Sequence, residues 1–234
     1  MNIRLFFLCT TLFIGWGHRL DAQEKSLDER LGEFLQANVY VNNHNILLPC
    51  KFTDLEHAGW SPVEDSLSNE LAPFQPTSKR AIRLVNKDNQ YLSVRFYNPY
   101  PQPIPIKDCY IFDVCTYDGF EYGIGPEDYH HAPDFEVCGL KSKKATPQDM
   151  MNTLGEFLAH WQFEAYQKSD IGSSYKLNYP FYDEGIEDDE PNNYLYLSVS
   201  KIDDYYPGKL IVMHYICAGD LLQKEKFLVP YKVK

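Results

Sequence analysis

The sequence predicts an α+β fold of two similar modules, each a short helix packed on an antiparallel sheet. Three observations lead to this prediction. Much of the chain after residue 80 consists of short runs rich in aromatic and β-branched residues, which is typical of strands. Each half also contains a short helix pattern that starts with a capping residue and has a glycine placed to end it. The tetrapeptide Tyr-Leu-Ser-Val occurs once in each half, at residues 91–94 and 196–199.

The first 22 residues have the pattern of a cleavable signal peptide. Arg4 precedes an almost wholly apolar run over residues 5–17, and Ala22 offers a small residue at the cut. The run is shorter than the roughly 20 residues that a membrane-spanning helix needs. We therefore expect a bacterial protein that loses residues 1–22 and is secreted or periplasmic, with no membrane span. Large residues precede Cys9, which disfavours lipidation there.

The charge balance excludes several classes of partner. The 234 residues include 22 basic and 33 acidic ones, for a net charge of −11. Removal of the leader leaves 212 residues (234 minus 22) and takes away two arginines and one aspartate, so the net charge becomes −12. Such a charge repels nucleic acids and anionic lipid surfaces. We expect neither as a partner.

The N-terminal module is expected at residues 23–128, and it opens with two helix signals. Residues 26–38 carry a capping box and an apolar stripe, which predicts an amphipathic helix. A second capping box lies at residues 53–56, and Gly59 is placed to end a short helix. The following interval, residues 61–78, is rich in proline, serine and acidic residues. We expect an exposed loop there.

Strand signals fill the rest of this module. Residues 81–85 and 91–97 flank Asn-Lys-Asp-Asn at 86–89, whose side chains can bond their own backbone, which predicts a β-hairpin. Residues 109–117 form the next expected strand. Its alternation predicts that the set Tyr110, Phe112 and Val114 faces the core.

The C-terminal module is expected at residues 129–234 and repeats this order. A strand is expected at residues 135–140, followed by a helix that starts at Thr146 and Pro147 and can end at Gly155. The remaining expected strands are residues 161–167, 175–181, 194–200, 210–217 and 227–233. In each module we expect the helix to bury its apolar side on that module's own sheet.

The second half, with its Thr-Pro-Gln-Asp helix start, Leu154-Gly155 and the strands after Trp161, resembles a unit of small exported bacterial proteins. This helix-then-sheet unit occurs in small outer-membrane assembly lipoproteins and in tandem-repeat β-lactamase inhibitor proteins. The resemblance covers about 80 residues of element order. It implies a protein-binding scaffold without catalysis. The chain departs from it by lacking a lipidation cysteine and by having an extra acidic insertion, and no functional residue carries over.

Five cysteines follow the leader: Cys50, Cys109, Cys115, Cys138 and Cys217. The odd number requires at least one free thiol or an intermolecular bond in an oxidising compartment, and the sequence leaves the pairing open. Cys109 and Cys115 are expected on one face of a strand about 20 Å apart, too far to bridge each other.

Aromatic residues supply the candidate binding site. The chain has 18 tyrosines, 14 phenylalanines and 3 tryptophans, and four tyrosines lie in turn-rich segments: Tyr97, Tyr100, Tyr205 and Tyr206. Exposed tyrosines are common at interaction sites because they combine a large rigid surface with a polar tip. We therefore expect an exported, non-catalytic binding protein that recognises a protein or a glycan through aromatic loop and sheet surfaces, without a cofactor.

Two other functions stay open at this stage. A secreted hydrolase would use carboxylates or the Tyr129-His130-His131 region, which acidic residues flank. The acidic run from Asp183 to Glu190 offers oxygens for Ca²⁺ but lacks the spacing of an EF-hand loop, so a solvated loop is expected and no metal site is assigned. A structural component of the cell envelope is the third candidate. Motifs for nucleophile elbows, zinc peptidases, phosphate loops and dinucleotide binding are absent from the sequence.

Overall fold

The structure is a computed structural model that describes residues 38–77, 81–116, 132–158, 164–169, 172–178, 193–200, 206–217, 221 and 227. The expected signal peptide lies outside these ranges. So do the expected helix at 26–38, apart from its last residue, and the expected closing strand at 227–233, apart from its first. In the described part, the fold is α+β and mostly antiparallel sheet.

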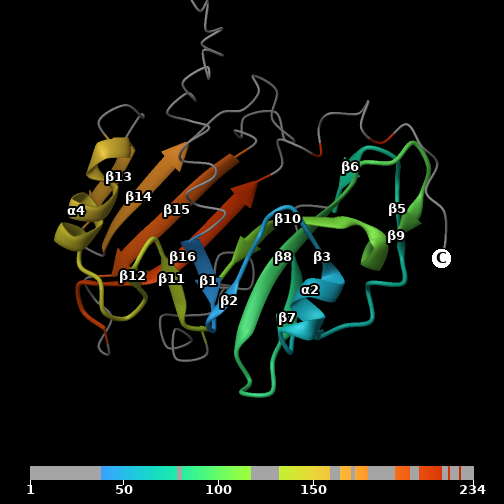
Figure 1. The fold of residues 1–234 in the computed structure, drawn as a ribbon, viewed down its shortest axis with the longest axis horizontal. Helices are drawn as coiled ribbons and strands as arrows, with labels where there is room; N and C mark the ends of the chain where they lie inside the picture. The colour runs from blue at the N-terminus through green and yellow to red at the C-terminus, as the bar shows by residue number, and fades with distance from the viewer. Residues whose placement is uncertain are drawn as a thin grey trace, which may run out of the picture.

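A ten-stranded antiparallel sheet forms the larger layer (Figure 1). Two of its strands lie off the main path: β3 (Cys50–Lys51) pairs with β10, and β6 (Gln75–Pro76) pairs with β8. The path itself runs β13 (Glu164–Ser169), β14 (Gly172–Asn178), β15 (Asn193–Ser200), β16 (Lys209–Cys217), β10 (Tyr110–Cys115), β8 (Tyr91–Asn98), β7 (Ile82–Val85), β4 (Ser61–Pro62).

A four-stranded sheet lies against the middle of this layer, between the two helices (Figure 1). Its order is β12 (Leu140–Lys141), β11 (Phe135–Val137), β1 (Val39–Val41) and β2 (His44–Asn45). We call it the small sheet. A separate two-stranded ladder joins β5 (Glu70–Leu71) to β9 (Ile104–Pro105), and a 3-10 turn, η1 (Ile106–Asp108), follows β9.

The first described helix, α2 (Phe52–His57), confirms one helix signal but begins earlier than the sequence predicted. Lys51 is its N-cap, and the backbone N–H of Lys51 donates to Oδ2 of Asp54 at 3.0 Å. The capping interaction therefore uses Asp54 and not the expected box at residues 53–56. Gly59 follows the helix with φ of +90°, as a glycine that ends a helix does.

The second described helix, α4 (Pro147–Leu158), starts where the sequence predicted. The backbone N–H and hydroxyl of Thr146 both donate to the Asp149 carboxylate, at 2.8 and 2.7 Å, which caps the first turn. The expected end at Gly155 is wrong, because the helix continues to Leu158. A glycine inside a helix costs only about 1 kcal/mol, so it does not by itself stop one.

The hairpin of β7 and β8 is confirmed, including the reason for its turn. Oδ1 of Asn86 accepts the backbone N–H of Asp88 and that of Gln90, both at 3.0 Å. The expected loop at residues 61–78 instead contributes three two-residue strands, β4, β5 and β6. The expected strand at 135–140 is split into β11 and β12 by a turn, because Cys138 and Gly139 both have positive φ, 53° and 86°.

A bulge changes the faces of β10. The pairing of β8 and β10 shifts register between Ile111 and Asp113, so the successive residues Phe112 and Asp113 lie on the same face and the alternation breaks after Phe112. Ile111 and Val114 face the main core together, whereas Phe112 packs in a second cluster on the other face. The expected set of Tyr110, Phe112 and Val114 on one face is therefore wrong.

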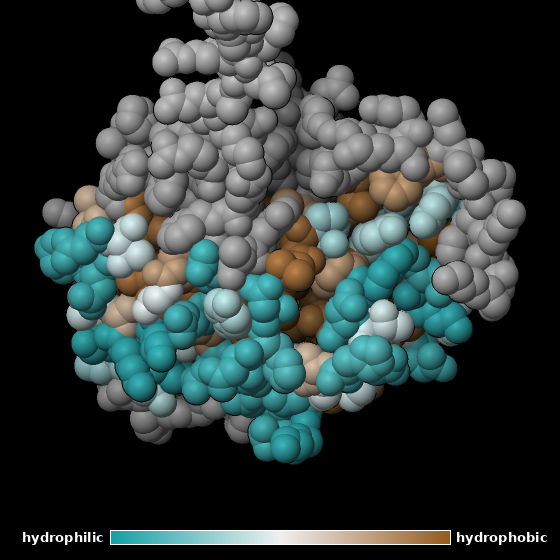
Figure 2. Space-filling view, in the orientation of Figure 1, coloured by the Kyte–Doolittle hydropathy of each residue, from teal (hydrophilic) through white to brown (hydrophobic). Residues whose placement is uncertain are grey.

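The main core fills the space between the two layers. It takes Val39, Val41, Phe135 and Val137 from the small sheet, Phe52 and Leu55 from α2, Met150 and Leu154 from α4, and alternate residues of β8, β10, β15 and β16. We call this side of the ten-stranded sheet its inner face. On the molecular surface seen in the same orientation, hydrophilic residues predominate below and flank a smaller hydrophobic patch near the centre (Figure 2).

Strands from the two expected modules lie in the same sheets. β10 of the first half pairs with β16 of the second, and β1 pairs with β11. A separate sheet for each module, with a boundary between residues 128 and 129, is therefore not confirmed. From these central pairs outward, the strands of the two halves follow matching orders. In the small sheet β1 and β2 match β11 and β12, and in the large sheet β10, β8, β7 and β4 match β16, β15, β14 and β13.

Candidate functional site on the outer face of the large sheet

The outer face of the ten-stranded sheet, opposite the main core, carries a row of polar and reactive side chains across five adjacent strands. Directly paired residues of an antiparallel sheet point to the same face. The pairings join, in order from β7 to β15, Arg83, Ser93, Cys115, His214 and Tyr196. We call these five residues the outer row. Ser93 is buried and the other four are partly exposed.

A buried ion pair lies beside the outer row. Nε of Arg95 donates to Oδ2 of Asp113 at 2.5 Å, and Nε2 of His214 lies 2.8 Å from Oδ1 of the same carboxylate. Asp113 is 3% exposed and Arg95 9%, whereas the His214 side chain is 27% exposed. The carboxylate thus connects a buried cation with an imidazole that reaches the surface.

The electrostatics of this group favour the charged form of Asp113. Burial raises the pKa of its carboxyl, but contacts with His214 and then with Arg95 lower it by more, so the pKa of Asp113 lies below its usual range. The Arg95 guanidinium also lies 5.3 Å from the centre of the Phe112 ring, a favourable position for a cation over an aromatic face. Asp113 is therefore an anion held between two partners.

Aromatic rings gather beyond this group, four of them on the same side of the sheet, whereas Tyr100 follows β8 and also packs against the main core. Tyr97 and Phe112 meet edge to face with ring centres 6.4 Å apart. Phe227 makes similar contacts with Tyr100 at 5.5 Å and with Tyr110 at 6.0 Å. We call these five residues the aromatic cluster. Its members except Tyr97 and Phe112 are partly exposed.

Lys51 places its amine within the aromatic cluster. Nζ lies 3.4 Å from the centre of the Tyr110 ring and 5.8 Å from that of Tyr100, and it donates to the Asp108 carbonyl at 2.6 Å. Burial is the largest influence on this amine and lowers the pKa of Lys51 to about 8. A lysine with this pKa is partly neutral at physiological pH, and the rings stabilise its charged form.

The structure separates the four tyrosines that the sequence singled out. Tyr97 and Tyr100 belong to the aromatic cluster, but Tyr97 is only 3% exposed and offers little contact area to a partner. Tyr206 lies elsewhere, with the Lys143 amine 5.8 Å from its ring centre. Tyr205 lies outside the described residues, as do Tyr129, His130, His131 and the acidic run 183–190.

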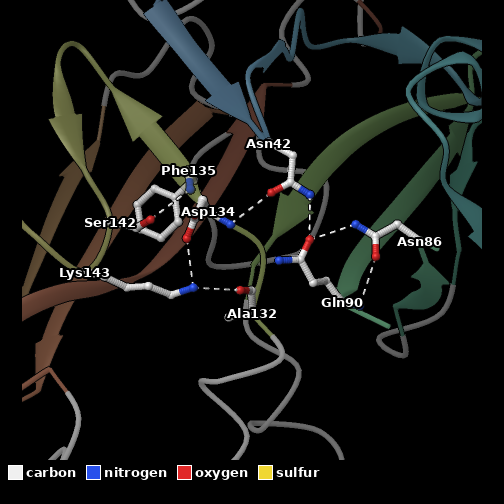
Figure 3. A network of polar contacts seen from close by, with 8 residues as sticks. All are labelled: Asn42, Asn86, Gln90, Ala132, Asp134, Phe135, Ser142 and Lys143. Carbon is white, nitrogen blue, oxygen red and sulfur yellow. Dashed lines mark hydrogen bonds and ion pairs between the residues drawn. The ribbon is translucent and has the colours of Figure 1, made fainter. Parts of the chain in front are cut away.

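A second polar network joins the small sheet to the hairpin of the large one (Figure 3). Nδ2 of Asn42 donates to Oε1 of Gln90 at 2.7 Å, and Nδ2 of Asn86 donates to the same oxygen at 2.8 Å. On the other side, Oδ1 of Asn42 accepts the backbone N–H of Asp134, whose carboxylate receives the Lys143 amine at 2.8 Å. These contacts fix the small sheet on the large one, away from the outer face.

Sequence reasoning did not identify the residues at the centre of this site. Arg95 and Asp113 each stand between two apolar strand residues, and a charge in such a position is the signal that could have found them. His214 carries a weaker signal, because a lone histidine in a strand is common. The closeness of these residues depends on the pairing of β8, β10 and β16, which no local pattern encodes.

Comparison of the chain with protein-family models, with curated proteins and with solved structures found no match. The resemblance to exported helix-plus-sheet proteins therefore stays a prediction. Within the described ranges, no helix is both long enough and apolar enough to cross a membrane. Among those same residues, no three histidine, cysteine or acidic side chains are placed to hold a metal ion together.

Proposed function

We propose that the protein is exported after loss of residues 1–22 and binds a partner protein through the outer face of the ten-stranded sheet. The observation that carries this proposal is the outer row, in which arginine, cysteine, histidine and tyrosine side chains are partly exposed on neighbouring strands. Arginine and tyrosine are enriched where proteins bind one another. A protein is favoured over a glycan because this surface combines such residues over several strands.

The buried ion pair gives independent support. Replacing a buried ion pair by apolar residues is often neutral or stabilising. A gain in stability therefore does not explain why Arg95 and Asp113 occur in this sheet. Groups with shifted pKa values cluster at functional sites. We infer that Asp113 serves the surface by holding His214 in one orientation, which keeps part of the outer row ordered before a partner arrives.

We further propose that the fold consists of two similar modules related by an approximate two-fold axis. Equivalent positions in the small sheet differ by 96 (138 minus 42 and 134 minus 38). The backbone N–H of Asn42 donates to the Asp134 carbonyl at 2.7 Å, and that of Cys138 donates to the Asn38 carbonyl at 2.8 Å. Exchanging the modules turns one of these hydrogen bonds into the other.

Further observations agree with this relation. The turn after β1 and the turn after β11 each contain two successive residues with positive φ, at equivalent positions. The two Tyr-Leu-Ser-Val segments lie on β8 and β15, which occupy matching places in the sheet order. In both segments the leucine and the valine face the main core. Two modules could therefore share one sheet by joining their last strands, β10 and β16.

The function is tested by capturing the partner with the leaderless protein from an envelope extract of the source bacterium. The test variant is the double substitution Arg83→Ala and Tyr196→Ala on the outer row. The control is Glu136→Ala with Lys141→Ala, which removes an exposed ion pair of 3.6 Å on the small sheet. We expect one identified protein to be retained by wild type and control and to fall at least tenfold with the test variant. Equal retention by the test variant, or binding only to a glycan array, contradicts the proposal.

A further inference from the structure

The outer row places a thiol beside an imidazole. Cys115 and His214 are direct partners in the pairing of β10 with β16 and point to the same face. Such partners have Cβ atoms about 4.5–5.5 Å apart, a distance that one side-chain bond on each side can close. Both residues are partly exposed. A reagent in solution can therefore reach both groups.

Asp113 orients the imidazole for proton transfer. An ionised carboxylate only accepts hydrogen bonds, so the 2.8 Å contact requires Nε2 of His214 to carry the hydrogen. Nδ1, the ring nitrogen nearer the backbone, is then the atom that can take a proton from Cys115. Arg95 holds the other carboxylate oxygen at 2.5 Å and fixes the acid in place. A nucleophile, a base and a group that orients the base are the three parts of an activated thiol.

The other described cysteines have different surroundings. Burial raises the pKa of Cys50, Cys109 and Cys138 to about 12 in each case. Cys217 is 7% exposed and faces the main core. Cys109 also faces that core, so the bulge at Phe112 overturns the expectation that Cys109 and Cys115 share a face. None of the five cysteines in the described part of the chain forms a disulfide, and among them Cys115 is the one that the sheet pairs with a histidine.

We propose that Cys115, His214 and Asp113 form a reactive-thiol site that exchanges with disulfides. The Sγ proton of Cys115 passes to Nδ1 of His214, and the thiolate attacks one sulfur of the incoming disulfide. That S–S bond breaks as the bond from Sγ to the attacked sulfur forms. The departing thiolate takes the proton from His214. Cys115 is oxidised to a mixed disulfide and the departing sulfur is reduced, so no other oxidant is needed.

Several groups surround Cys115 and His214 and influence how their reaction depends on pH. On β10 and β8 these are Asp113 and Arg95, and Ser93 is the direct partner of Cys115. On β15, Tyr196 is the direct partner of His214. This site goes beyond the proposed function and does not depend on it, since exchange requires no macromolecular partner.

The test measures the reaction of the folded, leaderless protein with Ellman's reagent, an aromatic disulfide. We expect one thiol per chain to react in a fast phase and mass spectrometry to place the label on Cys115. Cys115→Ser should abolish that phase. His214→Gln should slow it at least tenfold at pH 7 and move the midpoint of its pH–rate profile upward by about one pH unit or more, toward the value near 8.5 of an ordinary thiol.

Two outcomes overturn the site, and both are distinct from failure of the proposed function. Either the fast phase persists in Cys115→Ser, or His214→Gln reacts with an unchanged rate and pH profile. His44→Gln makes the same histidine-to-glutamine change at an exposed position on β2 of the small sheet; it is the matched control and should leave the rate within twofold. If a variant does not fold, mapping the label on the wild-type protein still decides the question, because labelling of a different cysteine contradicts the proposal. Glutathione disulfide then tests whether the site accepts an aliphatic disulfide.

Discussion

Nε2 of His214 donates a hydrogen bond to Oδ1 of Asp113 at 2.8 Å, although the two residues are 101 positions apart in the chain. The bond crosses the pairing of β10 with β16, where the first and second halves of the chain meet. It therefore links the surface that we propose for binding to the junction on which the fold depends. The predictions below begin with this junction.

Replacing Asp113 by Asn should strongly destabilise the protein. The substitution leaves the Arg95 guanidinium buried without its anion, and breaking one partner of a buried pair costs about 3–5 kcal/mol. Urea unfolding at pH 7 measures the loss. The control is Asp134→Asn, because Asp134 is 73% exposed in its ion pair with Lys143 and such pairs contribute about 1 kcal/mol or less. A loss at Asp113 no larger than at Asp134 would contradict the assigned role.

The stability of the protein should fall on acidification partly through Asp113. Contacts with His214 and Arg95 hold the pKa of Asp113 below its usual range when the chain is folded. The stabilisation is therefore present above the unfolded pKa of about 3.9 and is lost as the pH falls toward the folded value. Free energies of unfolding measured between pH 5 and pH 3 should decline more steeply in wild type than in Asp113→Asn. Parallel curves would show that this carboxyl is not the group responsible.

Lys51 should titrate well below the other lysines. Burial lowers its pKa to about 8, whereas the Lys141 side chain is 60% exposed and serves as the comparison. Because the folded pKa is below the unfolded value of about 10.4, this group makes folding more favourable as the pH rises from about 8 to about 10.4. Reductive ¹³C-methylation followed by an NMR titration resolves the two amines. A Lys51 signal that titrates together with Lys141 refutes the placement of its amine among the rings.

Gly139 should accept asparagine, the residue at the proposed equivalent position of the other turn of the small sheet, better than it accepts valine. Gly139 has φ of +86°, and Asn43, its equivalent in the proposed two-module relation, has φ of +65°. An added Cβ at Gly139 would meet no atom within 4 Å, so the backbone conformation alone decides the cost. Gly139→Val should lose about 1–2 kcal/mol. Gly139→Asn should lose less than half as much, because asparagine adopts this conformation at position 43. Thermal unfolding of both variants compares them, and equal losses would count against the equivalence.

The sequence predicted those elements that depend on hydrogen bonds between residues close together in the chain. The Asn86 turn and the Thr146 cap form within a few residues, so their hydrogen bonds could be expected from residue types alone. The errors in where the helices begin and end also have local causes. Asp54 rather than Glu56 caps α2, and Gly155 does not end α4. The bulge at Phe112 leaves no mark in the alternation of β10 and changed the faces assigned there.

The candidate site was beyond prediction because its residues meet through long-range pairing. Nothing near Asp113 in the chain indicates that β16 will lie beside it, and choosing Arg95 or His214 as its partners requires the order of the sheet. The tyrosines were chosen for their turn-rich surroundings, but Tyr97 is a paired residue of β8 itself and is buried in the second cluster. Repetition of element order is the long-range signal that the sequence offers, and the two similar modules that it predicts stay a proposal.

Site-specific photo-crosslinking tests the proposed binding surface most directly. A benzophenone amino acid is placed at Tyr196 on the outer row or at Met151, which lies on α4 and is 42% exposed. Both full-length proteins are expressed in the source organism and irradiated in intact cells. Binding through the outer face predicts a discrete higher-mass adduct with one partner protein from position 196 and none from position 151. An adduct from position 151 alone, or the same adduct from both positions, would contradict it.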